Sequence, residues 1–280
     1  MTPRARSSTR SPPCRPRAPT VPWTTWSSPA STSRRPDVAA LAQRVRRAFA
    51  RPGAPVVSYT LIILCVAAYL LQLAWPGFTA LMELDSVAIG GVFLSGPAAA
   101  FSGLVPFEPW RILTYGFVHS TASLIPWHLL LNMYTLWIFG VMLEPMIGRG
   151  RFLTLYLFGL VGGALGAYIL APGYAVVGAS GALFAMMAAL LIIQRSMGGQ
   201  TTQLLVLVAI NFIYGLFAGG VSWQTHLGGL VTGALVGLIL AETRRSRDRR
   251  AMIGYFVLLG AVMAVLFWIT PQVVWVRAFG

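Results

Sequence analysis

The 280-residue sequence has little charge and no lysine. Charged residues make up 10% of it, whereas soluble domains carry about 25%. Because 56% of the residues are hydrophobic, this composition indicates an all-α polytopic membrane protein and excludes an ordinary soluble domain. Seven stretches approach the roughly 20 apolar residues that a spanning helix needs. They are residues 56–75, 125–143, 152–171, 177–193, 203–218, 222–241 and 252–270.

Cysteine and histidine are also scarce, which limits the kinds of site the chain can form. The two cysteines, Cys14 and Cys65, share no motif, so we expect neither a disulfide nor a cysteine metal site. The three histidines belong to no His-Glu-x-x-His motif, and this argues against a zinc protease. We therefore expect no metal and no cofactor.

Arginine supplies all 21 basic residues, and eleven of them lie in residues 1–51. The basic patches do not alternate with aromatic residues as in a nucleic-acid groove, so we expect no nucleic-acid partner. Residues 1–54 are rich in Arg, Ser and Pro, which is typical of a disordered cytoplasmic extension. An organellar transit peptide is the alternative. Within the extension, residues 37–50 could form an amphipathic helix on the lipid surface.

The remaining arginines predict the orientation in the bilayer, because cytoplasmic loops carry an excess of them. Eight of these ten follow the second, fourth and sixth apolar stretches, whereas the long loop 76–124 has Glu83, Asp85 and Glu108 against Arg111 alone. We expect a cytoplasmic N-terminus, a six-helix core over 55–243, a basic cytoplasmic loop over 244–251, and a seventh helix with an external C-terminus over 252–280. Arg149 and Arg151 are expected in the loop after the second helix.

Four polar side chains are predicted at one depth near the outer surface. His128 and Asn132, four residues apart, share a face of the second helix. Ser180, in the stretch VVGASGALFA, begins the fourth helix, and His226 lies near the outer end of the sixth. Polar groups at such depth are costly unless they have partners or line a wet cavity, and so they suggest a functional site.

Glycines predict how these helices meet. Gly229 and Gly233 repeat on the face of His226, and Gly178 and Gly181 flank the serine. Because small-xxx-small faces let helices approach closely, Ser180 and His226 would come within hydrogen-bonding distance. That pair is a nucleophile with its base. No carboxylate is expected at this level, so the site would be a dyad.

The first turn of a helix leaves backbone N–H groups free. The N–H of Ser180 and the side chains of His128 and Asn132 are therefore candidates for an oxyanion hole. Taken singly, each residue also has a structural interpretation. Ser180 could be a packing residue, His226 a satisfied intramembrane polar group, and His128 with Asn132 an interhelical hydrogen-bonding pair.

Over residues 106–241 the sequence resembles the rhomboid family of intramembrane serine proteases. The resemblance lies in WRILTYGFVH, HLLLNMYTLWIFG, GVMLEPMIGRGRFLTLYLFG, GASGALFA and HLGGLVTGALVG, in this order. It implies a rhomboid-like six-helix bundle with one further C-terminal transmembrane helix, a 6+1 layout. It further implies an integral protein of a bacterial inner membrane, whose substrates are single-span membrane proteins cut in the outer part of their helix.

The resemblance also implies roles for individual residues. Ser180 would be the nucleophile and His226 the general base, with His128, Asn132 and the Ser180 amide in the oxyanion hole. Trp110, Arg111 and His119 would be structural. Phe184 stands where some members have a tyrosine packed on the histidine, and LIPW before His128 lengthens the loop relative to some bacterial members.

Two other functions compete with proteolysis. One is a catalytically inactive rhomboid-like chaperone, but such relatives lack the serine or the histidine. The other is a transporter-like polytopic protein, which predicts charges or broken helices at the membrane midplane. The apolar stretches show neither feature.

Overall fold

The computed structural model describes residues 53–75, 77–90, 108–217, 220–246 and 248–271, and apart from one isolated β-bridge these segments are helices and their connections. The predictions for residues 1–52, including the surface helix over 37–50, lie outside the described residues. So do residues 76 and 91–107, which belong to the long loop that we predict on the outer side, and the C-terminal residues 272–280.

The described helices confirm an all-α polytopic membrane protein. Five are long and apolar enough to cross a bilayer: α2 (Val56–Ala74), α7 (Trp127–Ile147), α8 (Arg149–Leu170), α11 (Trp223–Ser246) and α12 (Arg249–Thr270). The helices α9 (Ser180–Ser196) and α10 (Thr202–Phe217) are apolar but shorter, with 17 and 16 residues. Seven spans in a 6+1 layout therefore stay a prediction. Three short helices precede α7: α3 (Gly77–Met82), α4 (Ser86–Gly90) and α6 (Arg111–Thr114).

One predicted loop is wrong. Arg149 and Arg151 do not follow α7 in a connecting loop but form the first turn of α8. Gly148 alone separates the two helices, at φ +87°, a left-handed conformation that glycine adopts without steric cost. The chain therefore reverses in one residue, and hydropathy alone cannot reveal so short a turn.

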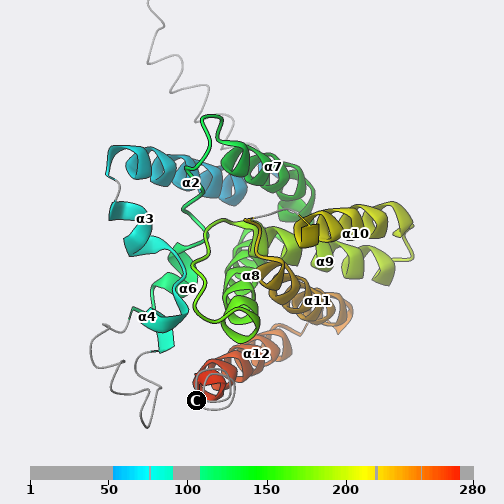
Figure 1. Ribbon diagram of the computed structural model, residues 1–280. Coiled ribbons are helices and arrows are strands. Elements are labelled where there is room, and N and C mark those ends of the chain that lie inside the picture. The colour runs from blue at the N-terminus through cyan, green and yellow to red at the C-terminus, as the bar shows by residue number, and fades with distance from the viewer. Residues whose placement is uncertain (1–52, 76, 91–107, 218–219, 247, 272–280) are drawn as a thin grey trace, which may run out of the picture. The chain divides into compact units, whose positions relative to one another are not determined.

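The helix α11 packs most extensively against α9 and α8, and α8 and α9 also contact each other. In Figure 1, α8 lies in the middle of the described helices, with α2 and α7 on one side and α12 on another. The remaining helix, α10, packs on α9 and α11. These three contacting helices, α8, α9 and α11, carry Ser180 and His226 between them.

A buried carboxylate joins α7 to α2. Glu144, near the end of α7, accepts hydrogen bonds from the backbone N–H groups of Val57 and Ser58, both at 2.8 Å, and from Ser58 Oγ at 2.7 Å. The first N–H groups of a helix lack intrahelical partners and carry partial positive charge, so a carboxylate there is stabilising. Glu144 thus fixes the start of α2 against the end of α7.

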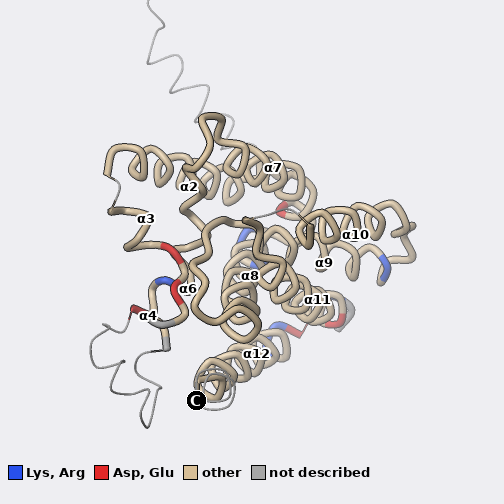
Figure 2. Tube along the Cα trace, in the orientation of Figure 1, with Lys and Arg blue, Asp and Glu red and all other residues tan. Residues whose placement is uncertain are grey.

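Most of the described arginines lie at one end of the long helices. Figure 2 shows blue positions at the start of α8, the end of α9 and the start of α12, with red positions among them, whereas the charged positions around α3, α4 and α6 are mainly red. Arg195 lies in the last turn of α9, and Ser180 is its first residue. At 1.5 Å per residue, the serine is about 22 Å from that arginine end.

Candidate active site

The backbone around Ser180 is held from two sides. Gly178, at φ +117°, donates its N–H to the carbonyl of Tyr115 at 2.9 Å. Two residues earlier, Val176 pairs with Leu84 in an antiparallel bridge, with N–H···O distances of 2.9 and 3.0 Å. Backbone hydrogen bonds to Leu84 and to Tyr115 therefore fix residues 176–178, which lead into Ser180 at the start of α9.

Ser180 and His226 lie within hydrogen-bonding distance. The Oγ of Ser180 is 3.0 Å from the Nε2 of His226, which projects from the first turn of α11. The two residues are 46 positions apart in sequence. Their proximity follows from the packing of α11 on α9.

Glycines allow this approach. A Cβ added at Gly229 would overlap the carbonyl oxygen of Gly181, and one at Gly233 would overlap the backbone of Ala185. Sequence reasoning missed a second such face: a Cβ on Gly228 would overlap the carbonyl oxygen of Gly162 on α8. With α9 on one face and α8 on another, α11 has little freedom to shift.

Two neighbours surround the His226 ring. Phe184, one turn after Ser180, stacks on the imidazole with ring centroids 4.2 Å apart at 24°. On the other side, a Cβ added at Gly215 of α10 would lie 2.9 Å from Nδ1. Nδ1 is buried without a hydrogen-bond partner among the described residues, so aromatic packing orients this ring. Sequence reasoning had not singled out Gly215.

The first N–H groups of α9, beside the serine, have no hydrogen-bond partner among the described residues. The first described intrahelical hydrogen bond of this helix runs from Leu183 N–H to Ala179 C=O, at 3.1 Å. The amides that precede Leu183 therefore face outward from the helix start, Ser180 N–H among them. An anion beside Ser180 would also meet the positive end of the helix dipole.

His128 lies directly against the serine loop, by which we mean residues 176–179 just before Ser180. A Cβ added at Gly178 would lie 2.8 Å from its Nε2. Its Nδ1 accepts the N–H of Ser120 at 3.2 Å, so the neutral ring carries its proton on Nε2. That tautomer directs an N–H donor toward the residues preceding Ser180.

Asn132 is placed differently from the other candidates. Its Nδ2 donates to the His128 carbonyl in its own helix at 2.7 Å, and its Oδ1 is buried without a partner among the described residues. One N–H of the amide therefore donates within α7, and the second N–H is available to another acceptor.

Trp110 and Arg111 contact the short helices of the preceding loop. Trp110 Nε1 donates to Leu81 C=O at 3.3 Å, and Arg111 Nη1 donates to Glu83 C=O at 2.9 Å. Arg111 also forms an ion pair with Glu108 at 2.5 Å. Partial burial raises the pKa of Glu83, and the nearby Arg111 opposes that rise.

His119 is fully buried, and the Gln72 side chain hydrogen-bonds its backbone N–H and C=O, both at 2.9 Å. Its ring lies 5.3 Å from that of His128, between centroids. Burial, and to a lesser degree the neighbouring His128, lower the pKa of His119 to about 3. The ring is therefore neutral near pH 7.

Tyr115 is a further residue that the sequence analysis missed. It is fully buried, and its hydroxyl donates to Leu160 C=O of α8 at 2.8 Å, while its own carbonyl holds Gly178. Its position within WRILTYGFVH, four residues after Arg111, was the only available signal. It links the serine loop to the central helix.

With this geometry in place, comparison with known proteins bears on the family. The family model described as Rhomboid domain matches residues 106–243. Rhomboid protease GlpG from Haemophilus influenzae is 30% identical over 148 residues, which are 50% of this chain and 73% of that protein. The chain belongs to the rhomboid family.

Other rhomboid relatives match over a similar stretch. Rhomboid protease GluP from Bacillus subtilis is 30% identical over 166 residues, 58% of this chain and 32% of that protein. RHOMBOID-like protein 6, mitochondrial, from Arabidopsis thaliana is 36% identical over 140 residues, 48% of this chain and 44% of that protein. The chain thus spans less than half the length of these two rhomboids.

Proposed function

We propose that this protein is an intramembrane serine endopeptidase that uses Ser180 and His226 as a catalytic dyad. The observation that carries the proposal is the 3.0 Å approach of Ser180 Oγ to His226 Nε2 at the start of α9. A serine hydroxyl is a weak nucleophile until an adjacent base takes its proton. The relatives named as rhomboid proteases support the same chemistry.

In acylation, Ser180 Oγ attacks the carbonyl carbon of the scissile peptide bond while its proton passes to Nε2 of His226. The tetrahedral intermediate collapses when the imidazolium returns that proton to the leaving nitrogen, and the C–N bond breaks. A water molecule then attacks the acyl-enzyme with His226 again acting as base, which releases the acid and restores the serine.

Within the described residues, no carboxylate hydrogen-bonds His226 to stabilise the imidazolium. His226 Nδ1 has no hydrogen-bond partner among the described residues, and the ring of Phe184 stacks on the imidazole with centroids 4.2 Å apart. An aromatic face attracts a cation, and the stacked geometry also fixes the ring plane. Phe184 is therefore proposed as the residue that positions the base.

The developing oxyanion would be stabilised by the Ser180 N–H, by His128 Nε2–H and by the remaining N–H of Asn132. Such donors act in the transition state, where the negative charge develops. His128 is supported by its tautomer and its contact with Gly178. Asn132 would complete the hole by reorienting its amide, because Nδ2 bonds within α7 in this structure.

We propose that the N-terminus is cytoplasmic, the C-terminus external, and the active site open to the outside. Arginines at the far end of α9 and at the starts of α8 and α12 support this orientation. The extra helix α12 follows the others, which supports a 6+1 layout. The rhomboid proteases from Haemophilus influenzae and Bacillus subtilis support a bacterial inner membrane as the location. A membrane-impermeant thiol reagent tests the orientation on Ala122→Cys made in a Cys14→Ser background, and labelling from the cytoplasmic side alone would contradict it.

Substrates would be single-span membrane proteins. A peptide bond within a helix is shielded by its hydrogen bonds, so attack requires local unwinding. Sequences with Gly, Ser or Pro near the outer end of the span should be cut faster than the same sequences with leucine, because glycine and proline weaken helices.

The test is cleavage of a labelled single-span substrate by purified protein in liposomes. Ser180→Ala and His226→Ala should each abolish cleavage, because the two side chains act as one unit. Ser196→Ala, at the opposite end of the same helix, serves as the matched control and should cleave normally. An intact wild-type protein that binds the substrate without cutting it would instead indicate an inactive rhomboid.

A further inference from the structure

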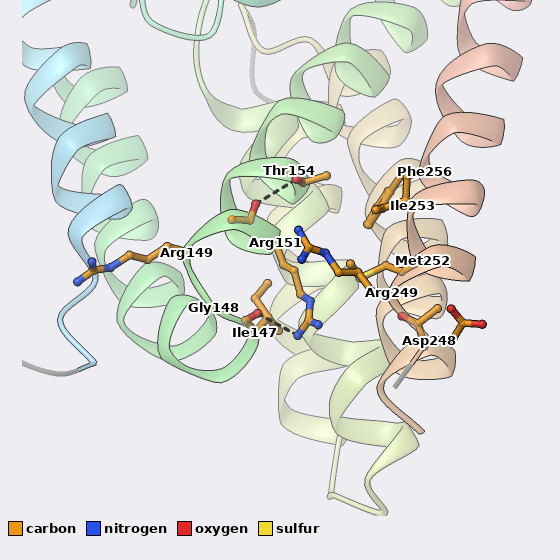
Figure 3. Close-up of a pocket in the computed structure, with 12 residues that line it drawn as sticks. Ile147, Gly148, Arg149, Arg151, Thr154, Asp248, Arg249, Met252, Ile253 and Phe256 are labelled. Carbon is orange, nitrogen blue, oxygen red and sulfur yellow. Dashed lines mark hydrogen bonds between the residues drawn. The ribbon is translucent and has the colours of Figure 1, made fainter. Parts of the chain in front are cut away.

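At the arginine-rich end of the molecule, a cavity of about 500 Å³ opens between the starts of α8 and α12. Its lining includes Arg151 and Thr154 of α8, Arg249 and Met252 of α12, and Thr243 of α11. Figure 3 shows the side chains of Arg151 and Arg249 reaching into it from opposite helices, whereas Arg149 points away. The cavity is remote from Ser180, because Thr243 in its lining and His226 beside Ser180 lie about 25 Å apart along α11.

The two arginines lack a counter-ion within the described part of the chain. No carboxylate there lies within 4.0 Å of either guanidinium, and the one described ion pair is Arg111 with Glu108. Arg151 Nη1 reaches only the Ile147 carbonyl, at 3.5 Å. Asp248 also lines the cavity, and its Oδ1 accepts the N–H groups of Arg250 and Ala251 and caps α12. The α8–α12 seam therefore brings Arg151 and Arg249 together with one carboxylate, and the arginines are in excess.

We propose that this cavity binds the phosphate group of an anionic lipid headgroup. Guanidinium groups bind phosphate through paired, charge-assisted hydrogen bonds, and basic pockets between membrane helices suit such headgroups. A phosphate between Arg151 and Arg249 would replace their repulsion by two attractions. Thr154 offers a hydroxyl beside them, although in this structure it donates to Gly150 C=O at 3.0 Å.

A second cavity on the same seam favours a lipid over free phosphate. It is about 470 Å³, is apolar, and is lined by Phe158 of α8, by Gly260, Met263 and Phe267 of α12, and at its far end by residues of α4 and α6. Arg249, Phe256, Gly260 and Phe267 are spaced by about two, one and two helical turns and so lie on one face of α12. From Arg249 to Gly260 is about 16 Å along the helix, roughly half the hydrocarbon thickness of a bilayer. An acyl chain attached to the bound phosphate would reach it.

The headgroup would serve to hold α12 on the core. Only 11% of the most apolar part of α12 is buried, against 61% for α8. Contacts with the other helices therefore hold α12 weakly. An anion bound by both Arg151 and Arg249 would bridge the two helices at their starts. This site is independent of the proposed proteolysis.

The test is lipid binding by the purified full-length protein, measured by titration and native mass spectrometry. Its arms are phosphatidylglycerol, the zwitterionic phosphatidylcholine, and inorganic phosphate as competitor. Phosphatidylglycerol should bind at least about tenfold more tightly than phosphatidylcholine. Inorganic phosphate at the same concentration should not displace it. Displacement would assign the cavity to free phosphate and overturn the lipid assignment.

The variant Arg151→Gln/Arg249→Gln should weaken phosphatidylglycerol binding about 30-fold, and Arg249→Gln alone about fivefold. Arg195→Gln, an exposed arginine at the same end but outside the cavity, is the matched control and should bind as the wild type does. Arg151→Lys/Arg249→Lys should recover part of the affinity, because lysine keeps the positive charge but lacks the planar guanidinium that makes paired hydrogen bonds to phosphate. Wild-type affinity in folded Arg249→Gln, or an equal loss in Arg195→Gln, would refute the proposal.

Discussion

Replacing Gly233 by alanine should move Ser180 and His226 apart, although neither of these residues is changed. Gly233 lies seven residues after His226 on α11, about 10 Å along the helix axis. The added Cβ would overlap the carbonyl oxygen and Cα of Ala185 on α9. Both are backbone atoms, so no side-chain rotation relieves the overlap, and the two helices must move apart by on the order of 1 Å to restore ordinary contact.

Such a shift would lengthen the 3.0 Å contact between Ser180 and His226 beyond hydrogen-bonding range. A misplacement of about 1 Å costs roughly 10²-fold in rate, so kcat/KM should fall by about that factor. Overpacking should also lower the free energy of unfolding by about 1–3 kcal/mol. The assay is cleavage of a labelled single-span substrate in liposomes, with the melting temperature measured on the same samples.

Gly254→Ala is the matched control for this substitution. It makes the same change within a spanning helix, but a Cβ at Gly254 would meet nothing within 4 Å. It should leave cleavage unchanged and stabilise α12 by up to about 1 kcal/mol, because alanine favours helix more than glycine does. If Gly233→Ala cleaved as fast as Gly254→Ala, close α9–α11 packing would not be what aligns the dyad.

Three further predictions address the surrounding residues. Gly178→Ala should reduce cleavage more than tenfold, because its Cβ would lie 2.7 Å from the His128 ring at a φ of +117°; wild-type activity would remove His128 from the site. Asn132→Ala should lower kcat by roughly 10–10³ with little change in KM; unchanged kcat with a lower melting temperature would leave Asn132 as a packing residue. The pKa of His119 lies near 3 in the folded protein and near 6.5 in the unfolded chain. As the pH falls, the unfolded chain therefore binds the proton at a higher pH than the folded protein does. The contribution of His119 to stability is therefore complete above pH 6.5 and is lost toward pH 3, by at most about 1.4 kcal/mol per pH unit. Thermal melts of His119→Asn should show a weaker acid dependence than the wild type, and identical dependence would contradict this.

Hydropathy predicted where the helices lie because burial in lipid requires long apolar runs. The predicted stretch over 56–75 corresponds to α2, and the stretch over 252–270 to α12. It failed at Gly148, where one residue in a left-handed conformation replaces a loop and both flanking segments are helical. Turns of that length leave no polar stretch in the sequence.

The polar residues of the candidate site could be found from sequence because they are rare in apolar helices. Their contacts could not. Glu144 is separated from Ser58 by 86 residues, and nothing local predicts that its carboxylate caps α2. The Asn132 amide bonds to its own helix, a choice between local and long-range partners that spacing does not determine. Tyr115 and Gly215 act through tertiary contacts alone.

The most direct test of the account is covalent labelling by a fluorophosphonate probe, read by peptide mass spectrometry. The probe reacts with a serine only when an adjacent base activates it. We predict a single adduct on Ser180 in the wild-type protein and in Ser196→Ala, and its loss in folded His226→Ala. An adduct that persists in His226→Ala, or that forms on another serine, would contradict the Ser180–His226 dyad.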